Sequence, residues 1–507
     1  MVPPSIRVVR DRTGSRQDFR RAVCDADPWD NPVMRMRPSS LVPPAIAGRV
    51  VLPVVARPTL LAAILCAVAV LTAMVPASVT LAVGGTYYVA TTGSDSAGGS
   101  STHPWRTLQR AANVAPAGST IRIRGGTYAP FTITRPSLTF ETYGSEAVSV
   151  AGNSSRDTVI RISGTRDVTL RGMTVRGAPV RFGAGVKVDG GSTRITIEDI
   201  RATENRSFGV LIEDSTYVTV QDSEILKNET GIQISRAGTG TVISSNSIHD
   251  NDRMIINDAT AWNDRGANAV VFYRTTGAIS VRNNTIYGHR ASSHDYGFDG
   301  GAFEIYGASN MVITGNRLYN NENVIETGTD GPACSNIRFT RNRAWGGNDG
   351  GRPSYGLILR CASDSLVANN TFYDLTDFVF YLKGGGAFAG SIERLRIRNN
   401  IAVQPNTKIY SLDTGIPSSV TIDHDLVWNA AGGSIAWVAA RGNTRYLGTL
   451  TSWTGYQDDG LRADPRLDMS DMRPRAGSPA IDAGIGISGV TTGFMGAGPD
   501  IGRYEVD

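Results

Sequence analysis

A basic stripe is absent from this sequence, although its formal net charge is +4. Residues 1–82 hold 10 of the 50 Lys and Arg residues but only 5 of the 46 Asp and Glu residues. The remainder of the chain therefore has 40 basic against 41 acidic residues, a net charge of about −1. A nucleic-acid-binding surface needs clustered positive charge. We therefore expect no nucleic-acid partner.

Helical segments are also missing between the short apolar runs that fill residues 168–400. In each unit an alternating apolar run is followed by a polar residue, usually Asn, and then by a second apolar run. The steps between successive polar residues, by subtraction of their numbers, are 23, 38, 32, 26, 28 and 30. Short β-runs repeating in this range are typical of a solenoid in which each repeat is one rung. The equivalent positions are Ser223, Asn246, Asn284, Asn316, Asn342, Asn370 and Asn400.

A second apolar alternation precedes most of these units. In residues 209–214, for example, Val210 and Ile212 should face the core while Leu211 and Glu213 face outward. Such rungs pair in parallel about 4.8 Å apart. A propeller would need longer repeats with hairpin signals between strands. We interpret the Asn column as structural, because inward Asn side chains at turns bond the turn backbone.

Residues 59–75 form an uncharged apolar run that is typical of a signal-peptide core. We therefore expect residues 1–82 to be a leader and the protein to be secreted. About 17 residues is short for a membrane span, so membrane contact is expected only if this segment stays uncleaved. Beyond the leader, Cys334 and Cys361 lie about one rung apart. A disulfide between adjacent rungs is one interpretation of this spacing, and two buried thiols are the other.

The start of the expected mature chain carries a recognisable set of short motifs. These are Tyr88-Val89, Gly93-Ser94-Asp95, Pro104-Trp105-Arg106-Thr107, a helical run over 108–115 and a strand over 121–128. Together they resemble the N-terminal cap of secreted right-handed parallel β-helix proteins, including polysaccharide lyases of the pectate lyase 9 type. Residues 464–467, 475–484 and 500–505 resemble the closing segment of these proteins.

The resemblance implies an all-β, right-handed parallel β-helix with a short N-terminal capping helix. That helix would cover the apolar end of the solenoid. We expect a leader over 1–82, an N-terminal cap over 84–130, the β-helix over 131–430 and a closing segment over 431–507. We also expect the protein to be a monomer.

The resemblance is less specific for function, because the same cap occurs in lyases, glycosidases, epimerases and uncharacterised surface proteins. In the lyases, clustered Asp residues hold calcium and a Lys acts as the base. None of the lysines in this chain follows an Asp cluster in that manner, so we do not carry the family's calcium and base residues over. Those lysines are Lys187, Lys227, Lys383 and Lys408.

The two longest steps of the repeat predict loops at 248–269 and 288–302, which should rim one lateral face. Polar and aromatic residues crowd these loops: Asp258, Trp262, Asp264, Arg265, His294, Asp295, Tyr296, Phe298 and Asp299. A His294 side chain beside Asp295 can serve as a general acid or base. Asx turns and solvated loop positions are the structural alternatives for these Asp and His residues.

Glu304 and Glu326 are the central candidates for catalysis. A four-residue insertion after Glu326 would make the two equivalent, with carboxylates roughly 5 Å apart on neighbouring rungs. Such a pair fits a retaining glycosidase and fits a calcium site equally well. Asp299 is the other candidate partner of Glu304, and a calcium ion would draw on Asp295, Asp299 and Asp330. Strict alternation after Val324 would instead point Glu326 into the core.

Further residues are predicted to bind substrate on the same face. The charged candidates are Arg274, Arg360 and Lys383, and the two arginines can pair with a uronate carboxylate. In an elimination, the base would be one of Arg274, Arg360, Lys383 and His294. The aromatic candidates for sugar rings are Trp262, Tyr273, Tyr306 and Tyr381.

These residues favour an exported protein that cleaves a polysaccharide, by elimination or by hydrolysis. The alternative is a non-catalytic, adhesin-like or glycan-binding surface module. Calcium is the one cofactor that the sequence suggests.

Overall fold

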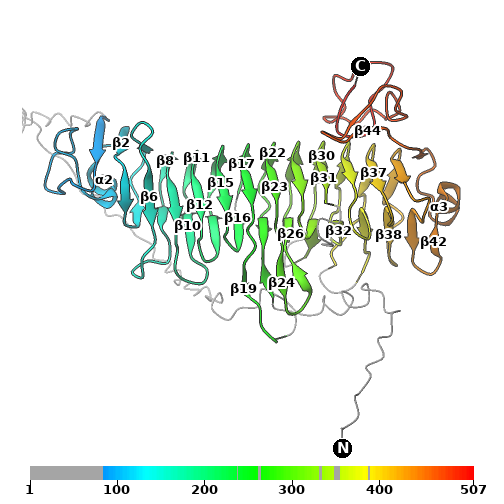
Figure 1. The fold of residues 1–507 in the computed structure, drawn as a ribbon, viewed down its shortest axis with the longest axis horizontal. Coiled ribbons are helices and arrows are strands. Elements are labelled where there is room, and N and C mark those ends of the chain that lie inside the picture. Colours follow the sequence, from blue (N-terminus) through cyan, green and yellow to red (C-terminus); the bar gives the residue numbers. More distant parts are fainter. Residues whose placement is uncertain are drawn as a thin grey trace, which may run out of the picture. The chain divides into compact units, whose positions relative to one another are not determined.

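The computed structural model describes residues 84–236, 238–260, 264–329, 334–346, 354–385 and 389–506. The described strands wind into a solenoid whose wall consists of three sheets of 13 strands each (Figure 1). Almost every strand pairs in parallel with the corresponding strand of the next turn, and each complete turn contributes one strand to each sheet. The parallel β-helix predicted from the repeat is therefore confirmed. The predicted leader lies outside the described residues.

The first sheet begins at β1 (Thr86–Val89) and ends at β39 (Thr421–Asp423). The second sheet begins at β3 (Gly126–Tyr128) and ends at β43 (Leu461–Arg462). The third sheet carries the candidate site. Its strands, in order, are β4 (Phe131–Ile133), β7 (Ile160–Ser163), β10 (Ala184–Asp189), β13 (Phe208–Glu213), β16 (Thr230–Ser235), β21 (Asn268–Tyr273), β26 (Gly301–Tyr306), β29 (Asn323–Gly328), β32 (Tyr355–Leu359), β35 (Phe380–Leu382), β38 (Tyr410–Leu412), β41 (Ala436–Val438) and β42 (Gly442–Thr444).

The core of the solenoid is built by the alternation seen in the sequence. On β13, Val210 and Ile212 are fully buried in one continuous apolar cluster. Glu213 faces outward as expected. Leu211 also leaves the core, but it is buried on the outer side against Ala184 and Phe208. The period-two pattern therefore predicted the direction of these side chains but not the apolar cover over Leu211.

The seven equivalent polar residues line one turn, between the first and second sheets, and form a single ladder. Asn284 Oδ1, for example, accepts from the backbone N–H of Asn246 at 3.0 Å and from its side-chain amide at 3.0 Å. The same pair of bonds repeats at each later rung, and the ladder ends on the Asp425 carboxylate. The structural interpretation of this column is confirmed.

The residue before each ladder position has a left-handed backbone. Examples are Asp222 with φ 49°, Asn283 with φ 57° and Gly315 with φ 70°. Asn, Asp and Gly tolerate this conformation better than other residues. A second, shorter ladder of Asn205, Asn228 and Asn251 lies between the second and third sheets and was not predicted from the sequence.

The two ends of the solenoid are covered differently. At the N-terminal end, α2 (Leu108–Val114) buries Leu108, Ala111 and Ala112, which confirms the predicted capping helix. At the other end lies α3 (Leu447–Thr454), with Leu450 buried (Figure 1). Within the described ranges, neither helix is long and apolar enough to cross a membrane.

Most of the predicted closing segment does not close the solenoid. Residues 464–506 instead lie along its outer side (Figure 1). Arg503 donates to the carbonyl oxygens of Gly315 and Asn316, at 3.1 and 3.2 Å. Arg343 donates to the carbonyl oxygen of Asp471. The segment thus braces the turns that carry the Asn ladder.

Candidate active site

The two long insertions form hairpins that brace each other. The first contains β19 (Met254–Ile256) and β20 (Arg265–Gly266), and the second contains β24 (Ala291–Ser293) and β25 (Gly297–Asp299). The Asp264 carboxylate accepts from the Ser293 hydroxyl at 2.7 Å and from the Asp295 backbone N–H at 2.9 Å. Both hairpins project beside β26 (Figure 1), so the prediction that the insertions rim one face is confirmed. Asp264 and Asp295 serve here as loop braces.

Each hairpin is anchored to the solenoid by an arginine that reaches a buried glutamate. Arg265 Nε lies 3.0 Å from Glu229 Oε1, and Arg290 Nε lies 3.3 Å from Glu322 Oε2. Each glutamate directly precedes a strand of the third sheet, Glu229 before β16 and Glu322 before β29. Burial raises the pKa of Glu229 to about 7, against the opposing effect of the Arg265 charge. Nothing in the sequence pattern signalled these two pairs, because they join residues from different rungs.

Glu304 and Glu326 occupy the same position on neighbouring strands. Glu304 on β26 is the register partner of Glu326 on β29. The preceding pair, Phe303 and Ile325, is buried in the core. The two glutamates must therefore point to the outer face. The predicted equivalence is confirmed, and the inward alternative for Glu326 is excluded.

The two carboxyl groups have different surroundings. Burial raises the pKa of Glu304 well above its usual value, and the nearby charges of Asp299 and Glu326 raise it further. Arg265 and a hydrogen bond from Asn268 act in the opposite direction. Neighbours that push two carboxyl groups toward different protonation states are typical of an acid and nucleophile pair.

Glu326 forms an ion pair with Arg360. Arg360 Nη1 lies 3.1 Å from Glu326 Oε1, and only 7% of the Arg360 side chain and 14% of the Glu326 side chain are exposed. Asn323 Nδ2 also donates to Glu326 Oε2, at 3.4 Å. Arg360 is thus engaged by a carboxylate of the protein, which differs from the predicted role of binding a uronate or acting as a base.

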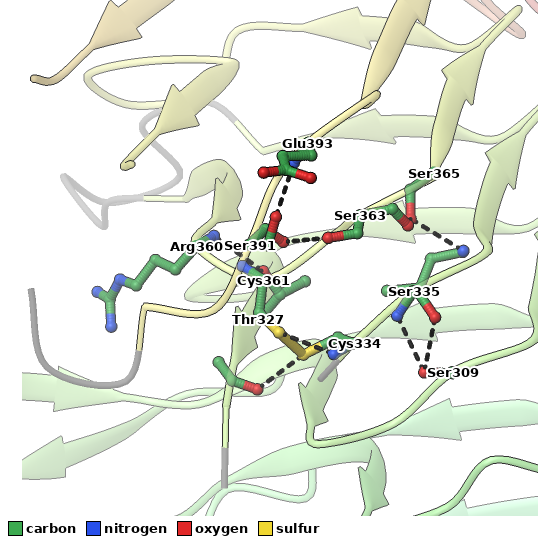
Figure 2. Close-up of a disulfide and its surroundings, with 12 residues drawn as sticks. Ser309, Thr327, Cys334, Ser335, Arg360, Cys361, Ser363, Ser365, Ser391 and Glu393 are labelled. Carbon is green, nitrogen blue, oxygen red and sulfur yellow. Dashed lines mark hydrogen bonds between the residues drawn. A yellow bond between two sulfur atoms is a disulfide. The ribbon is translucent and has the colours of Figure 1, made fainter. Parts of the chain in front are cut away.

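The Cys334–Cys361 disulfide lies directly beside Arg360 (Figure 2). It joins adjacent rungs with a Cα–Cα distance of 5.3 Å, so the structure selects the disulfide over two free thiols. The Thr327 hydroxyl oxygen accepts from the backbone N–H groups of Arg360 at 3.0 Å and Cys361 at 3.1 Å. The two hydrogen bonds to Thr327 therefore tie the backbone at Arg360 to β29, and the disulfide ties it to Cys334.

Tyrosines border the carboxylates. Tyr273 and Tyr306 are register partners on β21 and β26. Burial raises the pKa of Tyr306 well above its usual value, and Glu326 and Glu304 contribute to the shift. A Cβ on Gly328 would lie 2.6 Å from the Tyr306 ring, so only glycine leaves room for this ring. The guanidinium of Arg274 lies over Tyr273, 5.1 Å from the ring centroid.

Tyr296, in the second hairpin, also belongs to this cluster. Its pKa is raised by burial and by the nearby charges of Asp299 and Glu326. Asp299, Glu304 and Glu326 are hereafter called the carboxylate site.

Other predicted site residues lie farther from this pair or outside the description. The His294 side chain is 59% exposed, with Nδ1 4.0 Å from Asp295 Oδ1. Lys383 follows β35, two strands beyond β29. Tyr381, on β35, donates to Asp413 at 3.2 Å. Trp262 and Asp330 lie outside the described residues.

Asp295 and Asp299 are not brought together with a third metal ligand among the described residues. Within that part of the chain, one group of three His, Cys, Asp or Glu residues has ligand atoms within 4.8 Å of one another. It consists of Asp423, His424 and Asp459, next to the last strand of the first sheet. Asp330, the third predicted calcium ligand, lies outside the described residues, so the calcium site stays a prediction.

The stacked parallel turns and their lateral carboxylates define a right-handed parallel β-helix protein with a polar site on one face. A model of the "Pel9A-like, right handed beta helix region" matches residues 87–351, and a second model, "Right handed beta helix region", matches residues 268–448. The first match covers more than half of the chain. The chain therefore belongs to the Pel9A-like right-handed β-helix family.

One curated relative and two solved structures are similar to this chain. The uncharacterized protein YwoF of Bacillus subtilis (strain 168) is 33% identical over 127 residues, which span 22% of this chain and 27% of YwoF. The structure of XylC with xylose has a TM-score of 0.50 at 12% identity, covering 76% of this chain and 87% of that one. Pectate lyase Pel9A has a TM-score of 0.48 at 18% identity, covering 84% and 98%.

Proposed function

We propose that the protein is an exported retaining glycoside hydrolase that cleaves a polysaccharide at the carboxylate site. The observation that carries the proposal is the register pairing of Glu304, whose pKa is raised by burial, with Glu326, which pairs with Arg360. Register partners on parallel strands lie about 4.8 Å apart, and retaining glycosidases hold their carboxyl groups about 5–5.5 Å apart. The disulfide supports export, because disulfides persist in oxidising compartments.

In this mechanism Glu304 donates its proton to the glycosidic oxygen while a carboxylate oxygen of Glu326 attacks the anomeric carbon. The glycosidic bond breaks, the leaving sugar departs with the proton, and a glycosyl ester forms on Glu326. Glu304, now ionised, then takes a proton from water as the water attacks the same carbon. Glu326 is released as a carboxylate and again pairs with Arg360.

Elimination is less well supported by the described residues. It requires a cation to neutralise a uronate carboxylate and a base to remove the C5 proton. Arg360 already pairs with Glu326, and Arg265 with Glu229. The pair of carboxyl groups has a direct role in hydrolysis and lacks one in elimination.

The test is an assay of purified protein on neutral and uronic acid polysaccharides, with and without Ca²⁺. New reducing ends without absorbance from unsaturated uronate are expected. Reducing ends with that absorbance would show a lyase, and no new ends on any polymer would favour a glycan-binding module.

Two variants separate the roles of the glutamates. Glu304→Gln should lose polysaccharide cleavage but still release nitrophenol from a nitrophenyl glycoside of the same sugar, because that leaving group needs no proton. Glu326→Gln should be inactive on both. Equal residual activity of the two variants on both substrates would contradict the assignment.

A further inference from the structure

A column of aromatic side chains runs along the outer face of the second sheet. Its first members are His249 on β18 (Ser247–His249), Tyr287 on β23 (Thr285–Tyr287), Tyr319 on β28 (Arg317–Tyr319) and Trp345 on β31 (Arg343–Trp345), each the register partner of the next. Successive ring centroids lie 4.8, 4.7 and 4.7 Å apart, with interplanar angles of 3°, 4° and 17°. Rings stacked this closely leave no space between them.

The column is interrupted at one rung. Tyr373 on β34 (Thr371–Tyr373) continues the register from Trp345, but its own partner is Val403 on β37 (Ile401–Gln404). The next partner is Trp428 on β40 (Leu426–Asn429). Tyr373 and Trp428 therefore lie two rungs apart, about 9.6 Å, on either side of a short side chain.

A cavity of about 540 Å³ lies at this interruption, lined on the solenoid side by Tyr373, Trp428 and the largely buried Val403. The apolar residues that line it from the C-terminal segment include Pro465, Leu467 and Met469. Its other wall is the C-terminal segment, including β44 (Leu467–Asp468), which lies above β37 in Figure 1. That wall contributes Asp464, Arg466 and Arg475. The cavity thus has aromatic residues two rungs apart and hydrogen-bonding groups along one side.

We propose that this cavity, hereafter the aromatic slot, is a second saccharide-binding site that takes one sugar ring of a polysaccharide between Tyr373 and Trp428. The choice of a sugar rests on the proposed function. Ring contacts form at centroid separations of about 4.5–7 Å, so a ring midway between residues two rungs apart contacts both. A sugar ring has apolar C–H faces for the aromatic residues and a rim of hydroxyl groups for Asp464, Arg466 and Arg475.

The aromatic slot and the carboxylate site belong to different sheets, so the slot binds the polymer away from the point of cleavage. It would hold the polysaccharide near the protein between cleavage events. Its loss should weaken retention by a polymer without changing the hydrolysis of a short glycoside.

The test is affinity electrophoresis of the purified protein in gels that contain arabinoxylan, mixed-linkage β-glucan, linear arabinan or polygalacturonate. The Glu304→Gln background prevents cleavage during the run. In that background, Trp428→Ala should raise the dissociation constant for the retained polymer about tenfold.

Because Trp428 also packs against the C-terminal segment, a second variant fills the slot instead of emptying it. Val403→Phe places a third ring between Tyr373 and Trp428 and should reduce retention as strongly. Because Val403 is buried in a cluster with Leu467, a thermal melt followed by circular dichroism checks that this variant is folded. Tyr319→Ala, in the uninterrupted part of the column, is the matched control and should leave retention unchanged.

Unchanged retention in both slot variants, or no retention of the Glu304→Gln protein in any of the four gels, overturns the proposal. Cleavage of the same polymers by the wild type is measured separately. Cleavage without Trp428-dependent retention would reject the aromatic slot and leave the proposed hydrolase standing. Trp428-dependent retention without cleavage would support the aromatic slot and reject the proposed hydrolase.

Discussion

Glu304 and Glu326 face outward side by side, on consecutive strands of one sheet, although their distances along the chain to the next ladder asparagine differ by four residues. Two carboxyl groups this close cannot both ionise freely. Arg360 pairs with Glu326, and the pKa of Glu304 is raised instead. This asymmetry assigns different chemical roles to two residues of the same type.

The pH dependence of cleavage should have an alkaline limb set by Glu304. A general acid must be protonated, so kcat/KM should be highest below the raised pKa of Glu304 and fall as the pH rises through it. Arg265 opposes that shift, and Arg265→Gln should therefore move the limb to higher pH. A pH–rate profile of both proteins checks this, and a limb in the same place or at lower pH would contradict it.

Glu229 should make stability depend on pH near neutrality. Its folded-state pKa is about 7, above the ordinary value of 4.5, so the folded protein binds more protons than the unfolded chain between these values. The free energy of unfolding should therefore fall as the pH rises through this window, by on the order of 3 kcal/mol from this group. Urea unfolding at several pH values should show a shallower fall for Glu229→Gln. Parallel curves for the two proteins would refute the prediction.

The Asn ladder should contribute strongly to stability. Replacing Asn342 by Ala leaves the buried backbone N–H of Asn316 without its acceptor. It also removes the bonds that the Asn342 amide donates to Ile313 and Asn370. Each buried group left unpaired costs about 1–3 kcal/mol, so we expect a loss of about 3–5 kcal/mol in the free energy of unfolding. Asn406→Ala, at an exposed position, is the control and should change it by less than about 0.5 kcal/mol.

Removal of the disulfide should lower both stability and activity. A cross-link closing a 27-residue separation stabilises a chain by about 3–4 kcal/mol. The double variant Cys334→Ala/Cys361→Ala should unfold at lower denaturant concentration, and its kcat should drop several-fold because the backbone at Arg360 is released. Reductant should have the same effect on the wild type and none on the double variant. Activity unaffected by either treatment would separate the disulfide from the positioning of Arg360.

Much of the architecture could be predicted from local pattern. Alternation with period two specifies which side chains enter the core, and Asn recurring at one turn specifies the ladder, since each rung repeats the same local chemistry. The lateral position of the two insertions and the pairing of Glu304 with Glu326 followed from the same periodicity, whereas the capping helix followed from the family resemblance. Each depends mainly on residues within one rung or the next.

The sequence by itself therefore determined the solenoid, its ladder and the face that carries the two glutamates. Only the tertiary structure decided which charged residues pair: Arg360 with Glu326 and Arg265 with Glu229. It also decided that the C-terminal segment packs against the second sheet. A repeat pattern specifies the direction of a side chain on a regular strand. The partner that a long arginine side chain or an irregular loop reaches depends on how separate rungs stack. The spacing of residues along the chain does not specify which of them come into contact in this way.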